Sequence, residues 1–125
     1  MKILVVEDNA NMRTLLRLVL ERSCYVPLFA RDGKEGLEKA ITDKPKLILM
    51  DIRMPVMDGW ETMRALRAHP ETKEIPILVI TALLLSHELK ACLEAGCNGY
   101  IVKPFSILDL ESKIGELLAA PITEG

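Results

Sequence analysis

Short apolar runs alternate along the chain with longer segments in which apolar residues recur every three or four positions. The apolar runs, which predict β-strands, cover residues 2–7, 25–30, 46–51, 76–81 and 99–102. The segments with helical spacing cover residues 10–22, 34–43, 59–68, 85–95 and 106–119. This alternation predicts five βα units, and therefore one α/β domain built on a parallel sheet.

Helices are expected to cover both faces of this sheet. Segments 2–7, 46–51 and 76–81 are nearly continuous apolar runs, which is typical of parallel strands that are buried on both sides. Pro27 interrupts segment 25–30 and cannot donate to a hydrogen-bond ladder, so this strand is expected at an edge. In the helix at 10–22, the face expected to pack on the sheet carries Met12, Leu15, Leu16, Val19 and Leu20.

A doubly wound sheet of this kind has two common strand orders. The dinucleotide-binding order lacks support, because no G-x-G-x-x-G motif follows the first strand. We therefore expect a flavodoxin-like (βα)5 sandwich, whose five-stranded parallel sheet has the order 2-1-3-4-5. In this order the first and third strands are neighbours at the switch point, where open α/β sheets bind their ligands.

Polar side chains follow four of the five strands, at the point where each apolar run ends. They are Glu7 and Asp8, then Asp51, Thr81 and Lys103. Each alone is common in a turn or a helix cap. Together, at the carboxyl ends of parallel strands, they are expected to converge on one edge of the sheet.

This combination of side chains indicates phosphoryl chemistry with a divalent cation. Three nearby carboxylates repel one another unless a cation intervenes, and Mg²⁺ prefers carboxylate, water and phosphate oxygens. Asp51 is the candidate nucleophile, since an aspartate can form an acyl phosphate. Lys103 and Thr81 are suited to contact the phosphoryl oxygens. No His or Cys stands beside the acids, which argues against zinc.

Composition narrows the class of protein. The 125 residues carry 16 basic and 18 acidic side chains without a basic block, so a nucleic-acid surface is not expected. The apolar runs are too short to span a membrane, and the acidic start does not resemble a signal peptide, so a cytoplasmic location is expected. Cys24, Cys92 and Cys97 lack the spacing of a zinc site or a disulfide framework and are expected to be small apolar side chains.

The chain resembles the receiver domain of two-component response regulators. The resemblance lies in residues 3–9 (ILVVEDN), 49–59 (LMDIRMPVMDG), 76–82 (PILVITA) and 95–105 (AGCNGYIVKPF). It extends from residue 2 to about residue 119. We therefore expect a receiver domain over residues 1–120, followed by a C-terminal tail or linker at 121–125.

The resemblance implies a metal site and a phosphorylation site. It implies that Glu7, Asp8 and Asp51, with the backbone carbonyl of Arg53, hold Mg²⁺ or Mn²⁺. Asp51 would accept a phosphoryl group from a sensor histidine kinase or a histidine phosphotransfer protein. Glu7 stands where the family more commonly has Asp.

The remaining motif residues are implied to bind the phosphoryl group and to transmit its presence. Thr81 and Lys103 would contact the phosphoryl oxygens, and the bond between Lys103 and Pro104 is expected to be cis. Thr81 and Tyr100 would act together as a switch. The switch would remodel the face formed by residues 85–95, 99–102 and 106–119, which would then bind a protein partner.

The resemblance also sets expectations for the behaviour of the chain. We expect a monomer or a weak phosphorylation-dependent dimer, without direct nucleic-acid contact or membrane insertion. No enzyme activity is expected beyond its own phosphorylation and dephosphorylation. The chain would be a stand-alone receiver or the N-terminal receiver of a longer regulator with DNA-binding or enzymatic output.

Two other classes of protein share part of this pattern. A Mg²⁺-dependent phosphatase with an aspartate nucleophile usually needs a second carboxylate two residues later, where this chain has Arg53. A flavin-binding module would need a phosphate loop rich in Ser, Thr and Gly in place of Glu7 and Asp8.

Overall fold

The computed structural model describes residues 1–52, 59–82 and 86–119, with side chains included except at residues 86–89. Its strands are β1 (Lys2–Val6), β2 (Val26–Ala30), β3 (Leu47–Asp51), β4 (Ile77–Thr81) and β5 (Gly99–Val102). Its helices are α1 (Ala10–Arg22), α2 (Gly33–Asp43), α3 (Gly59–Ala68), α4 (Ser86–Ala95) and α5 (Ile107–Ala119). The expected boundaries at 120 and 121–125 fall outside the described residues.

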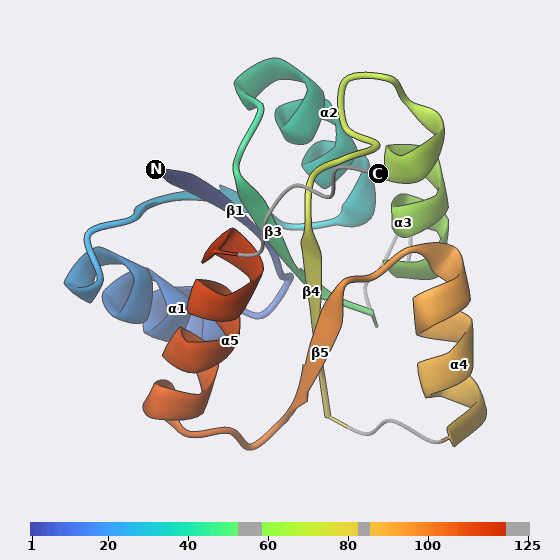
Figure 1. Ribbon diagram of the computed structural model, residues 1–125. Coiled ribbons are helices and arrows are strands. Elements are labelled where there is room, and N and C mark those ends of the chain that lie inside the picture. Colours follow the sequence, from blue (N-terminus) through green and yellow to red (C-terminus); the bar gives the residue numbers. More distant parts are fainter. Residues whose placement is uncertain (53–58, 83–85, 120–125) are drawn as a thin grey trace.

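The strands form one parallel sheet in the order β2-β1-β3-β4-β5 (Figure 1). The predicted flavodoxin-like order is therefore confirmed. Pro27 pairs with Ile3 in the outermost strand β2, as expected for a residue that lacks a backbone donor.

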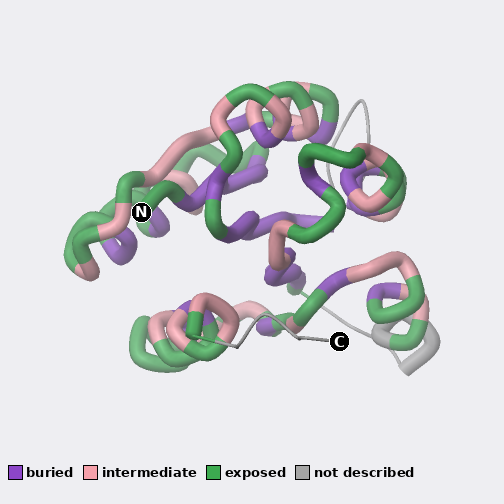
Figure 2. The backbone as a smooth tube through the Cα atoms, turned by 45° about the horizontal axis from the view of Figure 1, so that its top comes forward, coloured by how far each residue is buried: buried purple, intermediate pink, exposed green. Residues whose placement is uncertain are grey.

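Two apolar layers hold the sandwich together. On one face, residues such as Leu4, Ile48 and Val79 pack with side chains from α2, α3 and α4. On the other face, residues such as Val5 and Leu49 pack with α1 and α5. Alternate residues of each strand thus enter opposite layers, and Figure 2 shows the buried positions concentrated along the strands.

One position expected in the core lies at the surface. Leu15 was expected to pack on the sheet with its neighbours on α1, but it is 37% exposed. It lines a hollow with Met12, Pro104 and Phe105, beside the connection between β5 and α5. The helical spacing identified the correct side of α1, but Leu15 lies at the margin of that side.

The amino-terminal edge of the sheet is held by one guanidinium group. Arg67, in the last turn of α3, donates to the carbonyl oxygen of Gly96 from Nε (3.0 Å) and Nη2 (2.7 Å). Its Nη1 donates to the carbonyl of Ile75 at 2.7 Å, and its Nη2 donates to Oδ1 of Asn98 at 2.8 Å. Arg67 therefore links α3 to the segment before β4 and to the turn between α4 and β5.

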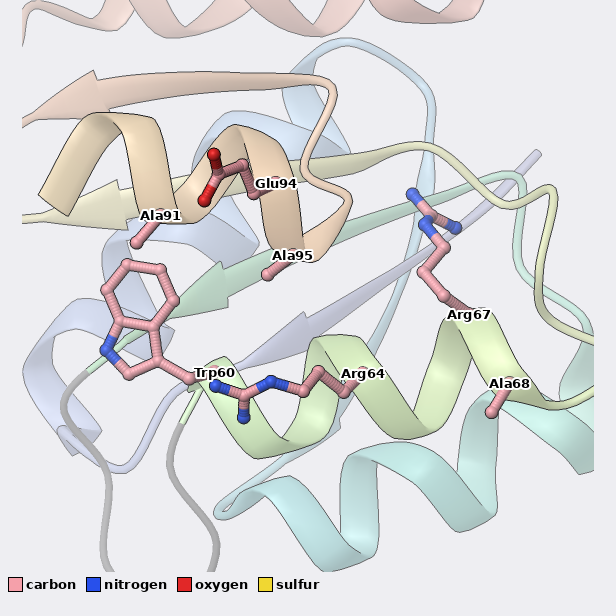
Figure 3. Close-up of a pocket in the computed structure, with 7 residues that line it drawn as sticks. All are labelled: Trp60, Arg64, Arg67, Ala68, Ala91, Glu94 and Ala95. Atoms are coloured by element: carbon pink, nitrogen blue, oxygen red, sulfur yellow. The ribbon is translucent and has the colours of Figure 1, made fainter. Parts of the chain in front are cut away.

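A groove of about 670 Å³ separates α3 from α4 (Figure 3). The side of α4 that faces it carries Ala91 and Ala95, which leave room, while α3 contributes the indole of Trp60 and the exposed Arg64. Trp60 is the second residue of α3, after Gly59, next to the carboxyl edge of the sheet. Among the described residues, no helix combines the length and apolar character needed to span a membrane.

Candidate metal centre

Strand register brings the predicted site residues to one edge. Val6 of β1 is paired with Met50 of β3, so the residues that follow, Glu7 and Asp51, lie side by side at the ends of these strands. Thr81 of β4 is paired with Val102 of β5, and the amide of the next residue, Lys103, donates to the carbonyl of Thr81 at 2.7 Å. The convergence expected from the sequence follows from this register.

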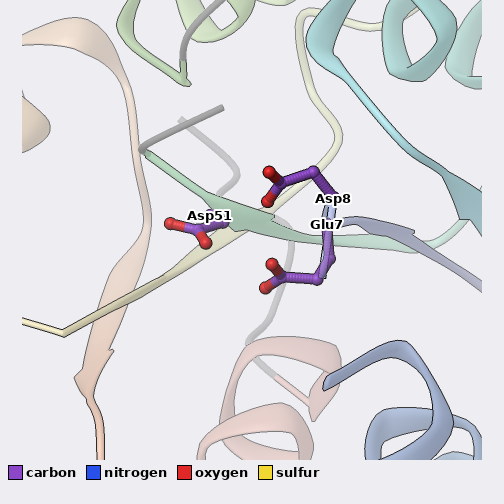
Figure 4. A group of neighbouring side chains, drawn as sticks. All are labelled: Glu7, Asp8 and Asp51. Carbon is purple, nitrogen blue, oxygen red and sulfur yellow. The ribbon is translucent and has the colours of Figure 1, made fainter. Parts of the chain in front are cut away.

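The three acids form one cluster (Figure 4). Glu7, Asp8 and Asp51 each offer a carboxylate oxygen, and these oxygens lie within 4.8 Å of one another. Glu7 is 2% exposed and Asp51 is 9% exposed, whereas Asp8 faces solvent. Two acids of the cluster are therefore buried, and the third is exposed to solvent.

Burial changes the acidity of Glu7. Loss of solvent raises the pKa of Glu7 from 4.5 to about 7, and repulsion by Asp51 adds to this effect. The amide of Asn9, which donates to Oε2 of Glu7 at 3.2 Å, and the charge of Lys103 act in the opposite direction. These favourable contacts do not offset the burial and repulsion of the carboxylate.

Lys103 supplies the positive charge that faces the acids. Its Nζ lies 3.4 Å from Oδ2 of Asp51 and 3.7 Å from Oε1 of Glu7. The peptide bond between Lys103 and Pro104 is cis. The Thr81 side chain is buried at the end of the neighbouring strand.

The donor set fits a hard divalent cation. Within the described residues, Oε1 of Glu7 is buried and accepts no hydrogen bond. A buried carboxylate oxygen without a hydrogen bond is costly, and the charge of Lys103, 3.7 Å away, offsets only part of this cost. Oxygen ligands from carboxylates, with one side open to solvent at Asp8, are those that Mg²⁺ uses.

Two residues that support the backbone of the site were not predicted from the sequence. The amide of Gly59 donates to the carbonyl of Ile52 at 2.8 Å, and a Cβ at this glycine would lie 2.6 Å from Cα of Ile52. Gly59 therefore lets α3 start against the backbone that carries Asp51, and its place in the motif at 49–59 was the available signal. Arg13 donates to the carbonyl of Glu7 at 2.9 Å, which the helical spacing of α1 did not reveal.

One predicted site residue lies apart from the cluster. Tyr100 sits in β5 opposite Val79, two positions before the residue that pairs with Thr81, and is 38% exposed. It lines a shallow hollow between β5 and α5. Arg53, expected to offer a backbone carbonyl to the metal, lies outside the described residues.

The chain belongs to the response regulator receiver domain family, whose sequence profile matches residues 3–115. It is similar to the alkaline phosphatase synthesis transcriptional regulatory protein PhoP of Bacillus subtilis, with 40% identity over 98% of this chain and 52% of that protein. The transcriptional regulatory protein HprR of Escherichia coli is 36% identical over 91% of this chain and 50% of that protein. The chain thus spans about half the length of these curated relatives.

Solved receiver structures resemble the fold closely. The receiver domain of the sensor histidine kinase PA1611 from Pseudomonas aeruginosa, with magnesium coordinated in its active-site cleft, superposes with a TM-score of 0.89 at 33% identity. That match covers 95% of this chain and 98% of the other. The chemotaxis protein CheY4 of Vibrio cholerae gives a TM-score of 0.88 at 31% identity, covering 93% and 97% of the two chains.

Proposed function

We propose that this receiver domain accepts a phosphoryl group on Asp51 with the help of Mg²⁺, or of Mn²⁺ in its place. The observation that carries the proposal is the cluster of Glu7, Asp8 and Asp51, whose oxygens lie within 4.8 Å of one another beside Lys103. A cation bound there would neutralise negative charge on the transferring group and on the acids.

The chain's own residues divide the remaining work. A carboxylate oxygen of Asp51 attacks phosphorus, and the bond between phosphorus and the donor's histidine nitrogen breaks. The Nζ atom of Lys103 lies 3.4 Å from Asp51, so it can form an ion pair with the phosphoryl oxygens after transfer. Thr81 ends the adjacent strand β4 and can donate its hydroxyl hydrogen to another of these oxygens.

The partners that this chemistry requires are proteins carrying a phosphorylated histidine. We infer a sensor histidine kinase or a histidine phosphotransfer protein as donor, in the cytoplasm. We propose no catalytic activity beyond the domain's own phosphorylation and dephosphorylation.

For output, we propose that phosphorylation repositions Thr81 and Tyr100 and thereby alters the face of α4, β5 and α5. Tyr100 and Val102 of β5 and Leu93 of α4 are exposed residues on elements that form this face. A protein target would read this face, with the chain a monomer or a weak phosphorylation-dependent dimer and without direct contact to nucleic acid. Phosphorylation supplies the charge that biases such a two-state equilibrium.

A second form of the proposal is that this receiver domain is part of a longer regulator. The transcriptional regulators PhoP and HprR are each about twice as long as the stretch that this chain matches. This observation favours a receiver that controls a following output domain over one that acts alone.

Mass spectrometry after incubation with acetyl phosphate tests the proposal. We expect one phosphoryl group per chain in the presence of Mg²⁺, and none when the metal is chelated. Asp51→Asn should abolish the adduct, while the same change at Asp43, at the end of α2, should leave it intact. An adduct that persists in the Asp51 variant would refute the assignment.

A further inference from the structure

The last turn of α4 ends in a motif that brings two cysteines together. Gly96 has a φ of 112° and follows the helix as its left-handed residue. Its amide donates to the carbonyl of Leu93 at 3.2 Å, and the amide of Cys97 donates to the carbonyl of Cys92 at 3.1 Å. These two bonds define a Schellman motif, in which the residue after the glycine contacts the residue five positions earlier.

In most proteins that contact joins two apolar side chains, but here it joins two thiols. Cys92 is fully buried and Cys97 is 7% exposed, and both belong to the apolar layer beneath α4. Burial raises the pKa of Cys97, and a hydrogen-bond interaction with the side chain of Cys92 acts in the opposite direction. Cys24, the third cysteine, is exposed beyond the end of α1 and lies outside this layer.

Arg67 fixes the turn from outside. Its two hydrogen bonds to the carbonyl of Gly96 and its bond to Asn98 hold both sides of Cys97. Oδ1 of Asn98 also accepts from the amide of Ile77 at 2.9 Å, so the turn is tied to the start of β4. A Cβ at Gly96 would lie 2.8 Å from Cγ of Arg67, so the stem of the arginine also occupies the space beside the turn.

We propose that Cys92 and Cys97 form a thiol modification site that closes to an intramolecular disulfide on reaction with hydrogen peroxide. The thiolate of Cys97 attacks the peroxide, which gives a sulfenic acid on Cys97 and hydroxide that leaves as water after protonation. The sulfur of Cys92 then attacks the sulfenic sulfur, its proton and the departing hydroxide form a second water, and the disulfide results. In total, two thiols lose two hydrogens and one peroxide is reduced to two waters.

The backbone contact favours this closure. A disulfide needs Cα atoms close together and Cβ atoms directed toward each other, and a direct hydrogen bond between the two residues' backbones keeps them near. Cys97 is the more exposed of the two, so it is the first to meet an oxidant. Burial raises the pKa of Cys97, and the reaction is therefore slow until the turn opens locally.

The closed bond would join the last turn of α4 covalently to the residues that enter β5. These elements form part of the face proposed for output, while Asp51 lies at the opposite edge of the sheet. Oxidation would thus restrain the output face without altering phosphoryl acceptance. The two chemistries can therefore be tested independently.

The test uses the full chain carrying Cys24→Ser, so that only the buried pair remains. After hydrogen peroxide treatment under native conditions, we expect a mass loss of two hydrogen atoms and a peptide in which residues 92 and 97 are linked. Further replacement of Cys92 by Ser should abolish the link and leave a sulfenic acid that a dimedone probe traps on Cys97.

Two results would overturn the proposal. One is a native protein that gains oxygen atoms on either cysteine without forming the link. The other is a link that appears only when urea is present, which would show that the folded turn prevents closure. Acetyl phosphate labelling of Asp51 in the same samples confirms that the oxidised protein remains folded.

Discussion

Each edge of the sheet shields a charged group from solvent, Arg67 in part and Glu7 almost completely, but the two groups differ in their hydrogen bonds. At the amino-terminal edge, burial lowers the pKa of Arg67, yet its guanidinium donates to backbone carbonyls on three sides. At the carboxyl-terminal edge, burial raises the pKa of Glu7 to about 7, and its Oε1 accepts no hydrogen bond from the described residues. The charged group at the amino-terminal edge is hydrogen-bonded within the chain, whereas at the carboxyl-terminal edge the proposed cation would supply the missing partner.

This difference separates a structural charge from a functional one. A buried charge whose hydrogen bonds are all made within the fold stabilises that fold, and its removal leaves several carbonyls without donors. A buried carboxylate oxygen that accepts no hydrogen bond destabilises the metal-free chain. The same oxygen favours the binding of a cation that can reach it. Replacing the charged group is therefore expected to lower stability at the amino-terminal edge and to raise it at the carboxyl-terminal edge of the metal-free chain.

The largest effect is expected at Arg67. Arg67→Met should lower the free energy of unfolding by about 3 kcal/mol, because the carbonyls of Ile75 and Gly96 lose their donor. Urea unfolding measures this change. Arg64→Met is the matched control on the same groove; since Arg64 is exposed, it should change stability by less than about 0.5 kcal/mol. Equal losses in the two variants would remove the structural role assigned to Arg67.

The next effect is the pH dependence of the metal-free protein. Between pH 4.5 and about 7 the folded chain keeps a proton on Glu7 that the unfolded chain releases. Stability should therefore fall as pH rises through this window, by at most about 3 kcal/mol from this group. Urea unfolding at several pH values in the presence of a chelator measures the slope. A rise in stability over the same window that Glu7→Gln leaves unchanged would contradict the account.

A smaller gain is expected from removing the buried charge. At pH 8 without metal, Glu7→Gln should stabilise the fold by about 1–2 kcal/mol, because a neutral amide replaces a buried carboxylate beside Asp51. Thermal unfolding without Mg²⁺ measures this gain. Thermal unfolding with Mg²⁺ measures how much less the metal stabilises the Glu7 variant than the unchanged chain. Glu21→Gln, on the exposed side of α1, is the control and should behave as the unchanged chain does. Destabilisation of the Glu7 variant under these conditions would show that the carboxylate is structural.

Much of the carboxyl-terminal edge could be predicted from the sequence. Parallel strands end in register, so Glu7, Asp51 and Thr81 meet whenever the strand order is correct. The continuous apolar runs indicated a parallel sheet, and the absence of a G-x-G-x-x-G motif after the first strand favoured the flavodoxin-like order.

The amino-terminal edge could not be predicted in this way. Arg67 occupies a polar position of an amphipathic helix, where an arginine usually faces water, and most of its partners are backbone carbonyls, which carry no sequence signature. The contact between Cys92 and Cys97 likewise depends on the left-handed Gly96. Helical spacing also does not show that Leu15 lines a hollow with Phe105 instead of packing between α1 and the sheet.

Calorimetric titration with Mg²⁺ tests the central claim most directly, with Trp60 fluorescence as a second signal from the start of α3. At pH 8 the account predicts saturable binding at one site, weakened by Glu7→Gln and Asp51→Asn and unchanged by Arg64→Met. Below pH 7 it predicts that binding releases a proton, since the metal must displace the one held by Glu7. Absence of saturable binding, or binding that both acidic substitutions leave unchanged, would contradict the claim that the carboxyl-terminal edge is built to receive a cation.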